Sequence, residues 1–346
     1  MKNYVPLLMF FSILLNCCHS QTTNLHDSVY YKTFPNALTV RIYSVKDYAD
    51  FSFRPISNNT SLKYKSNTTL NLGAGVTYKN LSGNFSSDFG FLNRGIQDRG
   101  KTEFLDFQVH FFPQKWTSDI LYQHYKGFYL SPQNYAGLVP KGYYYRPDIS
   151  LNFVAISAYR LQNSRQFSFR SAFNQNEWIR KSSGTFLYGG NVSYENIASK
   201  DSSLIPSKVN DLFPNAGANK FHFISFGPGA GYAQTVVFKN HFYILGSAIL
   251  NGNLNFCINE SDSITNNKTS FEPGIIFKTA AGYGGSVWNV SLSWAGNLLL
   301  IQQAGLTKAN NFYSGELRLT LARQISLKKP IPFLGKTLDN IFGKED

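Results

Sequence analysis

Six histidines are the residues of this 346-residue sequence that could carry acid–base chemistry: His19, His26, His110, His124, His222 and His241. His110 and His124 are expected on neighbouring strands, and Asp106 shares the face of His110, so a histidine dyad with a nearby carboxylate could form. If a serine attacked a lipid while such a histidine accepted the serine proton, the two residues would form the active site of a lipid hydrolase. No GxSxG motif accompanies the histidines, so the hydrolase is the alternative and no catalytic residue is assigned.

Basic side chains form a second candidate set. We expect these to point into the interior of the fold, because each stands opposite an apolar face: Arg41, Arg160, Arg170, Lys278 and Arg318. With Asp106 and His110 they make up the predicted lumen-facing residues. One interpretation is a lumen that favours small anions. The other is solvated interior residues that pair with Asp106, Asp119 or Glu316.

The charge and the motifs exclude several partners. The net charge is +13, but the basic residues are scattered and no nucleic-acid-binding motif is present, so nucleic acid is not expected. The scattered basic residues are better suited to contact anionic lipid headgroups. The stretch from Gly227 to Gly231 lacks the GK[ST] ending of a phosphate loop and is interpreted as a strand kink or bulge. No Cys/His cluster has zinc spacing, so neither a metal nor another cofactor is predicted.

The elements that position these residues follow a targeting segment. Lys2 precedes an apolar run from Val5 to Leu15, and small residues lead to a predicted cleavage after Ser20, so residues 1–20 are a signal peptide. The run is shorter than the roughly 20 residues of a membrane-spanning helix. Lipid modification at Cys17 or Cys18 is the alternative. After cleavage Cys257 is the only cysteine, so no intramolecular disulfide is expected.

The rest of the chain alternates apolar with small or polar residues. The composition favours strands, with 30 Phe and 21 Tyr against two Met. Alternating segments of about 9 to 14 residues match strands that cross a bilayer at a tilt, whereas strands of soluble proteins are shorter. The predicted fold is an all-β antiparallel transmembrane β-barrel, and a secreted soluble antiparallel β protein is the alternative. The apolar faces include Leu70, Leu72, Val76 and Tyr78; Leu105, Phe107, Val109 and Phe111; Phe153, Ala155 and Tyr159; Trp288, Val290, Leu292 and Trp294; and Leu317, Leu319 and Leu321.

Short and long links alternate between these segments, as in barrels with short periplasmic turns and long outer loops. Short links include Pro113 to Lys115 and Lys239 to His241; long links, predicted outside, include Ser131 to Arg146 and Cys257 to Phe271. We count thirteen candidate strands, beginning near residues 38, 61, 81, 102, 116, 147, 166, 184, 221, 242, 272, 287 and 312. Bacterial single-chain barrels have an even number, so about twelve are predicted, with fourteen as the alternative. The conflict in parity lies between Leu161 and Lys220.

The barrel is assigned to residues 37–326, after an N-terminal periplasmic segment at 21–36. Residues 327–346 are expected to form a short amphipathic C-terminal tail on the periplasmic side, because Phe333, Leu334, Leu338, Ile341 and Phe342 recur at helical spacing. A frayed tail is the alternative.

Several strings resemble a family of Bacteroidetes proteins catalogued as domain of unknown function 4421. These are LTVRIYS at 38–44, NTTLNLGAGVTYKNLS at 67–82, YKGFYL at 125–130, FSFRSAFNQNEW at 167–178 and SLIP at 203–206. The resemblance spans about residues 30–325 and implies a Bacteroidetes source and an outer-membrane barrel, without an activity. We therefore expect a passive pore or envelope scaffold in the outer membrane, with outer-membrane lipid and small anionic solutes as partners. The oligomeric state stays open.

Overall fold

The structure is a computed structural model that describes residues 26–56, 61–79, 81–89, 96–113, 115–200, 202–213, 217–260, 265–302, 310–329 and 331. The predicted signal peptide, the cysteines considered for lipid modification and the predicted helix of the tail lie outside these residues. Within the described residues, no helix is long and apolar enough to cross a membrane.

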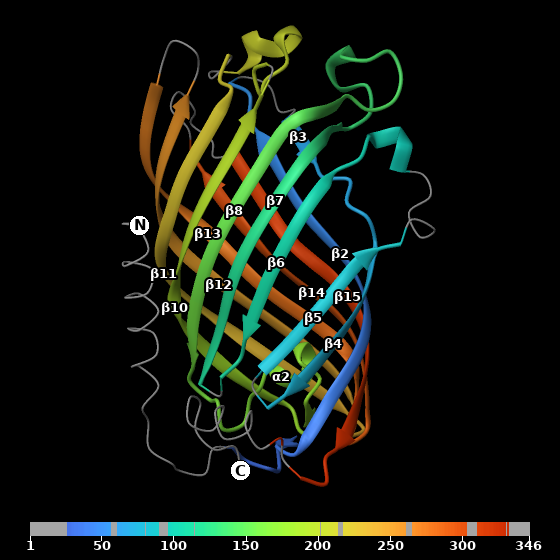
Figure 1. Cartoon of the computed structure of the whole chain (residues 1–346). Coiled ribbons are helices and arrows are strands. Elements are labelled where there is room, and N and C mark those ends of the chain that lie inside the picture. The colour runs from blue at the N-terminus through green and yellow to red at the C-terminus, as the bar shows by residue number, and fades with distance from the viewer. Residues whose placement is uncertain are drawn as a thin grey trace, which may run out of the picture.

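One antiparallel sheet curls round and closes on itself (Figure 1). Closure is made by β15 against β2, in a register that runs from Asn311 with Ser52 to Ser326 with Ala37. The structure thus confirms the all-β antiparallel barrel. The strands of the sheet are β2 (Ala37–Phe53), β3 (Leu62–Lys65), β4 (Asn71–Tyr78), β5 (Leu81–Asp88), β6 (Glu103–Phe111), β7 (Trp116–Ser131), β8 (Tyr145–Leu161), β10 (Ser183–Ser199), β11 (Lys220–Phe238), β12 (Phe242–Glu260), β13 (Thr265–Gly284), β14 (Trp288–Ile301) and β15 (Asn310–Ser326).

In the described residues the closed ring contains ten strands, with three more attached, in place of the twelve or fourteen predicted. The strand predicted from about residue 61 is two strands that share one edge of β2: β3 pairs with its upper end and β4 with its lower end. Among the described strands, β3 is the one that links β2 to β7, so it completes the ring on this side. Below it, β5 pairs with β4 and β6 pairs with β7.

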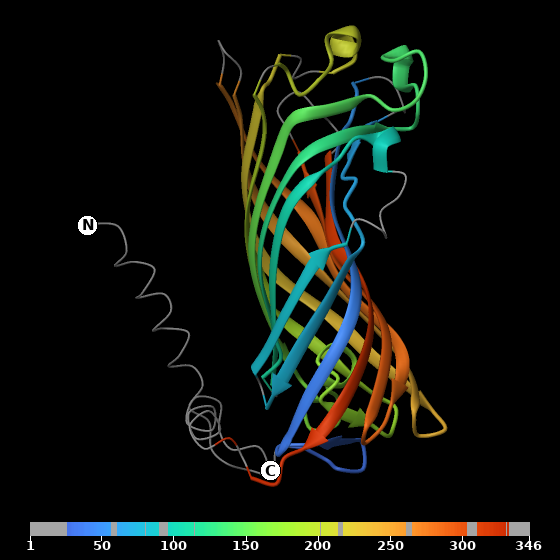
Figure 2. The same ribbon diagram turned by 45° about the vertical axis from the view of Figure 1, so that its right-hand side comes forward.

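Within the described residues, no strand of the barrel wall begins near residue 166, where one was predicted. Residues 162–182, here called the mouth segment, contain the short helix α2 (Arg170–Phe173) and β9 (Glu177–Ile179), which pairs with β1 (Tyr31–Thr33). Figures 1 and 2 place α2 inside the lower end of the barrel. Hydrogen bonds tie the segment to the surrounding wall: Asn289 donates to the Ser171 carbonyl at 3.3 Å and Gln175 to the Ser291 hydroxyl at 3.2 Å. The parity conflict arose here because this segment is not part of the wall.

One link and one glycine stretch differ from the prediction. Cys257 to Phe271, predicted as a long outer loop, is strand for most of its length, since β12 and β13 remain paired from Phe242 with Tyr283 to Glu260 with Thr265. Cys257 is therefore a buried strand residue.

The glycine stretch at 227–231 contains no bulge, because the β10–β11 register passes through it unchanged. Its glycines leave room in the wall: a Cβ on Gly229 would lie 1.9 Å from Asn251 Oδ1.

Alternation separates an apolar outer face from a mixed interior. On β14, Val290, Leu292 and Trp294 are exposed, whereas Asn289 and the alternating serines are buried. Aromatic residues also mark the lower rim, at the ends of four strands: Trp116, Phe238, Phe242 and Trp288. The outer surface is thus an apolar belt with an aromatic lower edge.

Two aromatic clusters fill the interior, one above the other along the barrel axis. The lower cluster joins the wall to the mouth segment through residues such as Phe112, Phe167 and Phe169. The upper cluster includes Phe51, Phe53, Tyr64, Phe128, Phe153, Phe221 and Phe312. On β8 the buried face is thus the aromatic one, and the prediction that Phe153 and Tyr159 face outward is wrong: Val154 and Ile156 do.

Candidate functional site

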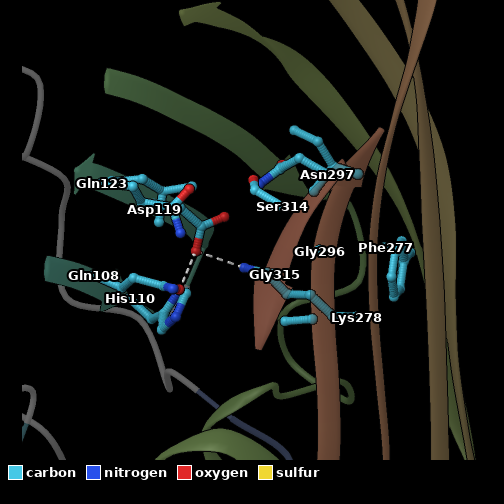
Figure 3. Close-up of a pocket in the computed structure, with 13 residues that line it drawn as sticks. Gln108, His110, Asp119, Gln123, Phe277, Lys278, Gly296, Asn297, Ser314 and Gly315 are labelled. Carbon is cyan, nitrogen blue, oxygen red and sulfur yellow. Dashed lines mark hydrogen bonds and ion pairs between the residues drawn. The ribbon is translucent and has the colours of Figure 1, made fainter. Parts of the chain in front are cut away.

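Between the aromatic clusters lies a layer of charged side chains that spans the lumen (Figure 3). Lys278 on β13 reaches β7, on the opposite side of the ten-strand ring, where its Nζ lies 2.8 Å from Asp119 Oδ1 and 3.0 Å from Thr117 Oγ1. The same carboxylate oxygen is 2.7 Å from His110 Nδ1, since His110 and Asp119 are register partners on β6 and β7. Asp119 is therefore the centre of the layer.

A second ion pair continues the layer on β15. Arg318 Nη2 donates to Glu316 Oε2 at 2.7 Å, and the guanidinium lies 4.6 Å from the ring centroid of Tyr43. Glu316 Oε1 is also 3.9 Å from His110 Nε2. Contacts thus run from Lys278 through Asp119, His110 and Glu316 to Arg318, and the interpretation of Lys278 and Arg318 as ion-paired interior residues describes the geometry.

Asp106 lies beside this layer on β6. Its Oδ2 accepts hydrogen bonds from Gln123 Nε2 and the Tyr125 hydroxyl, each at 2.6 Å. Its Oδ1 is buried and has no hydrogen-bond partner among the described residues. Asp47 on β2 is buried nearby and makes no ion pair within the part of the chain that the structure describes. These two carboxylates remain without a counter-charge in contact.

Arg41 and Arg170 occupy different places from the layer. Arg41 is buried on β2 against Gly75 of β4, and its Nε and Nη2 have no hydrogen-bond partner in the part of the chain that the structure describes. Arg170 belongs to α2 rather than to a strand, and it pairs with Glu177 at 3.3 Å within the mouth segment. It also donates to the Lys79 carbonyl at 3.1 Å, so its role there is to hold the mouth segment against the wall.

Two residues, Arg160 and His124, face outward and so cannot take part in the chemistry predicted for the interior. Arg160 is exposed and shares the outward face of β8 with Val154 and Ile156, so its assignment to the lumen is wrong. His124 lies on the outward face of β7 with Tyr122, where its Nδ1 is 2.7 Å from Asn152 Oδ1. His110 faces inward, so the two histidines cannot form a dyad across the wall.

The charged layer contains the histidine and carboxylate of a hydrolase site but does not place a serine beside the histidine. His110 is oriented by a carboxylate, as a general base requires, but its other nitrogen faces Glu316 instead of a serine hydroxyl. Removing one partner of such a buried ion pair is destabilising, because an uncompensated charge is left in the interior. Across the described residues, no group of three or more His, Cys, Asp or Glu could hold a metal ion.

A cavity of about 420 Å³ adjoins the layer where β5 and β6 face each other. Its inner lining includes Asp47, Asp106 and Arg318, and its outer lining includes Phe85, Leu105 and Phe107. Sequence reasoning missed Asp47, although a carboxylate at an inward position of an alternating strand was a usable signal. In the described sheet β5 and β6 are not paired with each other, and this gap had no such signal, because both strands alternate like paired strands.

The family model for a domain of unknown function, DUF4421, matches residues 26–321. The chain belongs to this family. The match covers the mouth segment, the charged layer and all strands except the end of β15. No curated protein matches this DUF4421 chain.

Several solved outer-membrane structures are distantly similar to the DUF4421 chain. Neisserial surface protein A has a TM-score of 0.23 at 10% identity, with 84% of this chain and 99% of that one covered. For OmpT of Vibrio cholerae the TM-score is 0.28 at 11% identity, covering 82% and 98%. The COG4313 outer membrane channel of Pseudomonas putida F1 has a TM-score of 0.26 at 7% identity, covering 89% and 100%. Likenesses this weak carry no argument about the activity of the DUF4421 chain.

Proposed function

We propose that this protein is an outer-membrane β-barrel that acts without catalysis, as a binding barrel or envelope scaffold with a closed lumen. The observation that carries the proposal is the apolar outer belt on a closed ring. Outward residues of β14 and β15 such as Leu292, Trp294 and Leu319 are about half exposed, a pattern that suits lipid and would be a liability in water. The aromatic rim at Trp116 and Trp288 matches the girdle at a membrane interface.

Membrane fractionation tests the location. We expect the mature protein in the outer-membrane fraction, migrating differently in boiled and unboiled gel samples because a closed barrel keeps its backbone groups paired in mild detergent. Recovery from the soluble periplasm would refute the proposal and favour the alternative, a secreted soluble β protein. A Bacteroidetes source is part of the same proposal and rests on the family resemblance.

The filled interior favours a closed barrel over a permanently open pore. Aromatic clusters lie above and below the charged layer, and the mouth segment occupies the lower end. A pore would require at least one of these to move. The anion preference stays a proposal, and its support is reduced because Lys278, Arg318 and Arg170 each contact a carboxylate. Arg41 is the basic residue that still favours it.

A further inference from the structure

The wall of the barrel is interrupted between β5 and β6. β5 pairs with β4 along its whole length, and β6 pairs with β7, but no pairing joins β5 to β6 in the described part of the sheet. Figures 1 and 2 show the two strands as neighbours on one side of the barrel, below the bridge that β3 makes. Each strand therefore presents an edge of backbone N–H and C=O groups to the other.

This interruption lies within the apolar belt. Phe85 on β5 is 77% exposed, and Leu105 and Phe107 on β6 are 59% and 58% exposed. Unpaired strand edges are unfavourable in hydrocarbon, because lipid offers no hydrogen bonds to the backbone. A polar occupant, water or a ligand headgroup, would satisfy these edges from the inner side.

The 420 Å³ cavity lies directly behind the interruption and connects the two environments. Its lining changes from Phe85 and Leu105 on the outside to Asp47 and Asp106 on the inside. Such a gradient fits an amphiphile that leaves its chain in the bilayer and places its head inside the wall. A water-soluble solute would not require the apolar part, and a hydrocarbon would not use the carboxylates.

The charges on the inner lining of the cavity determine which headgroup of an amphiphile would fit there. Glu316 and Arg318 neutralise each other at 2.7 Å. Within the described residues, Asp47 and Asp106 form no ion pair, and Oδ1 of Asp106 is buried without a hydrogen-bond partner. An ammonium group would supply the missing charge and donors, whereas a carboxylate head would meet two like charges at close range.

We propose that the gap between β5 and β6 is a lateral portal through which an amphiphile with an ammonium head and an apolar chain enters the barrel wall from the outer membrane. The portal rests on the proposed membrane location, since only lipid would deliver such a ligand sideways. The head would contact Asp106 and Asp47, and the chain would lie against Phe85 and Phe107.

Photolabelling of the purified protein in liposomes tests this portal. The probes are dodecylamine, dodecanol and dodecanoic acid, each with one diazirine on the chain, and mass spectrometry locates the label. We expect dodecylamine to label residues 81–89 and 103–111 above the rest of the belt, and dodecanoic acid to label them least. Preferential labelling by dodecanoic acid would overturn the ammonium head, and uniform labelling of β12 and β14 would overturn the portal.

Two matched pairs of variants sharpen the test. Gly83 and Gly246 are both exposed glycines whose added Cβ would meet nothing within 4 Å, but only Gly83 lines the cavity. Gly83→Trp should obstruct the portal and reduce labelling, and Gly246→Trp should leave it unchanged. Labelling that persists in Gly83→Trp contradicts the portal.

The second pair tests the charge. Asp106→Asn should reduce dodecylamine labelling about tenfold and spare dodecanol, because one charge-assisted contact is lost. Glu195→Gln changes a buried carboxylate on β10 that lies outside the cavity and should have no effect. An equal loss in both variants would overturn the assignment of Asp106. Heat-modifiable migration of every sample shows that the barrel is folded, so a failed portal and a failed membrane location give different results.

Discussion

At the scale of single residues, the ammonium of Lys278 joins opposite sides of the ring through Asp119. Lys278→Met should lower the free energy of unfolding by about 3 kcal/mol, since it leaves a buried carboxylate without its counter-charge. The double variant with Asp119→Asn should regain part of this loss. Urea unfolding in detergent measures both effects.

The control for Lys278 is Lys115→Met, which removes a lysine whose side chain is exposed in the turn between β6 and β7. It should change the unfolding free energy by no more than about 0.5 kcal/mol. A loss in Lys278→Met as small as in this control would show that the cross-lumen contact does not stabilise the barrel.

The kinds of residue that occupy the interior were predicted more accurately than the individual positions that face inward. Lys278 and Arg318 were predicted to face inward and do so: Arg318 stands between the exposed Leu317 and Leu319, and Lys278 is buried beside the partly exposed Phe277. Arg160 was misplaced because β8 carries apolar residues on both faces: Phe153 and Tyr159 pack inside while Ile156 faces out. Where the interior is itself aromatic, polarity no longer tells which face of a strand meets lipid.

At the scale of elements, Cys257 reports on the length of β12. Its side chain is 1% exposed, and its sulfur lies 3.2 Å from Asn259 Oδ1 within the strand. A thiol reagent should therefore fail to label the folded protein and should label it after unfolding in urea. Rapid labelling of the folded barrel would mean that β12 and β13 end before Cys257, as the alternation alone had suggested.

Introduced cysteines can then establish the orientation of the barrel in a Cys257→Ser background. Gln133 lies in the long link between β7 and β8, and Ser286 lies in the short turn between β13 and β14, both exposed. With the usual orientation of outer-membrane barrels, a membrane-impermeant reagent should label Gln133→Cys in whole cells and spare Ser286→Cys. The opposite pattern would place the short turns outside.

Elements with continuous alternation were predictable, whereas interruptions were not. β6, β14 and β15 follow their predicted alternation because apolar and polar residues trade places along them without a break. The polar stretch before Phe271 suggested a loop, yet it forms strand because backbone pairing with β12 continues outside the apolar belt. The division of one expected strand into β3 and β4 depends on their different partners, which lie far away in the sequence.

At the scale of the whole molecule, two barriers lie in series along the lumen. The mouth segment closes the lower end through contacts such as Gln175 with Ser291, and the upper aromatic cluster includes Phe51 and Phe128, whose rings are 5.1 Å apart. Ions must pass both barriers, so loosening one should leave the other in control of conductance. A barrel of ten strands is also narrow enough for side chains to fill it.

Planar-bilayer recording should therefore show a silent wild-type protein. Gln175→Ala and Phe128→Ala, each alone, should remain nearly silent, and the combined variant should conduct, because only then are both barriers weakened. If the open variant prefers anions, Arg41→Gln should reduce that preference, since Arg41 is a buried guanidinium with unpartnered nitrogens. Steady conductance of the wild-type protein would contradict the closed barrel and make it a pore, and a preference unchanged by Arg41→Gln would remove the basis for anion selectivity in this lumen.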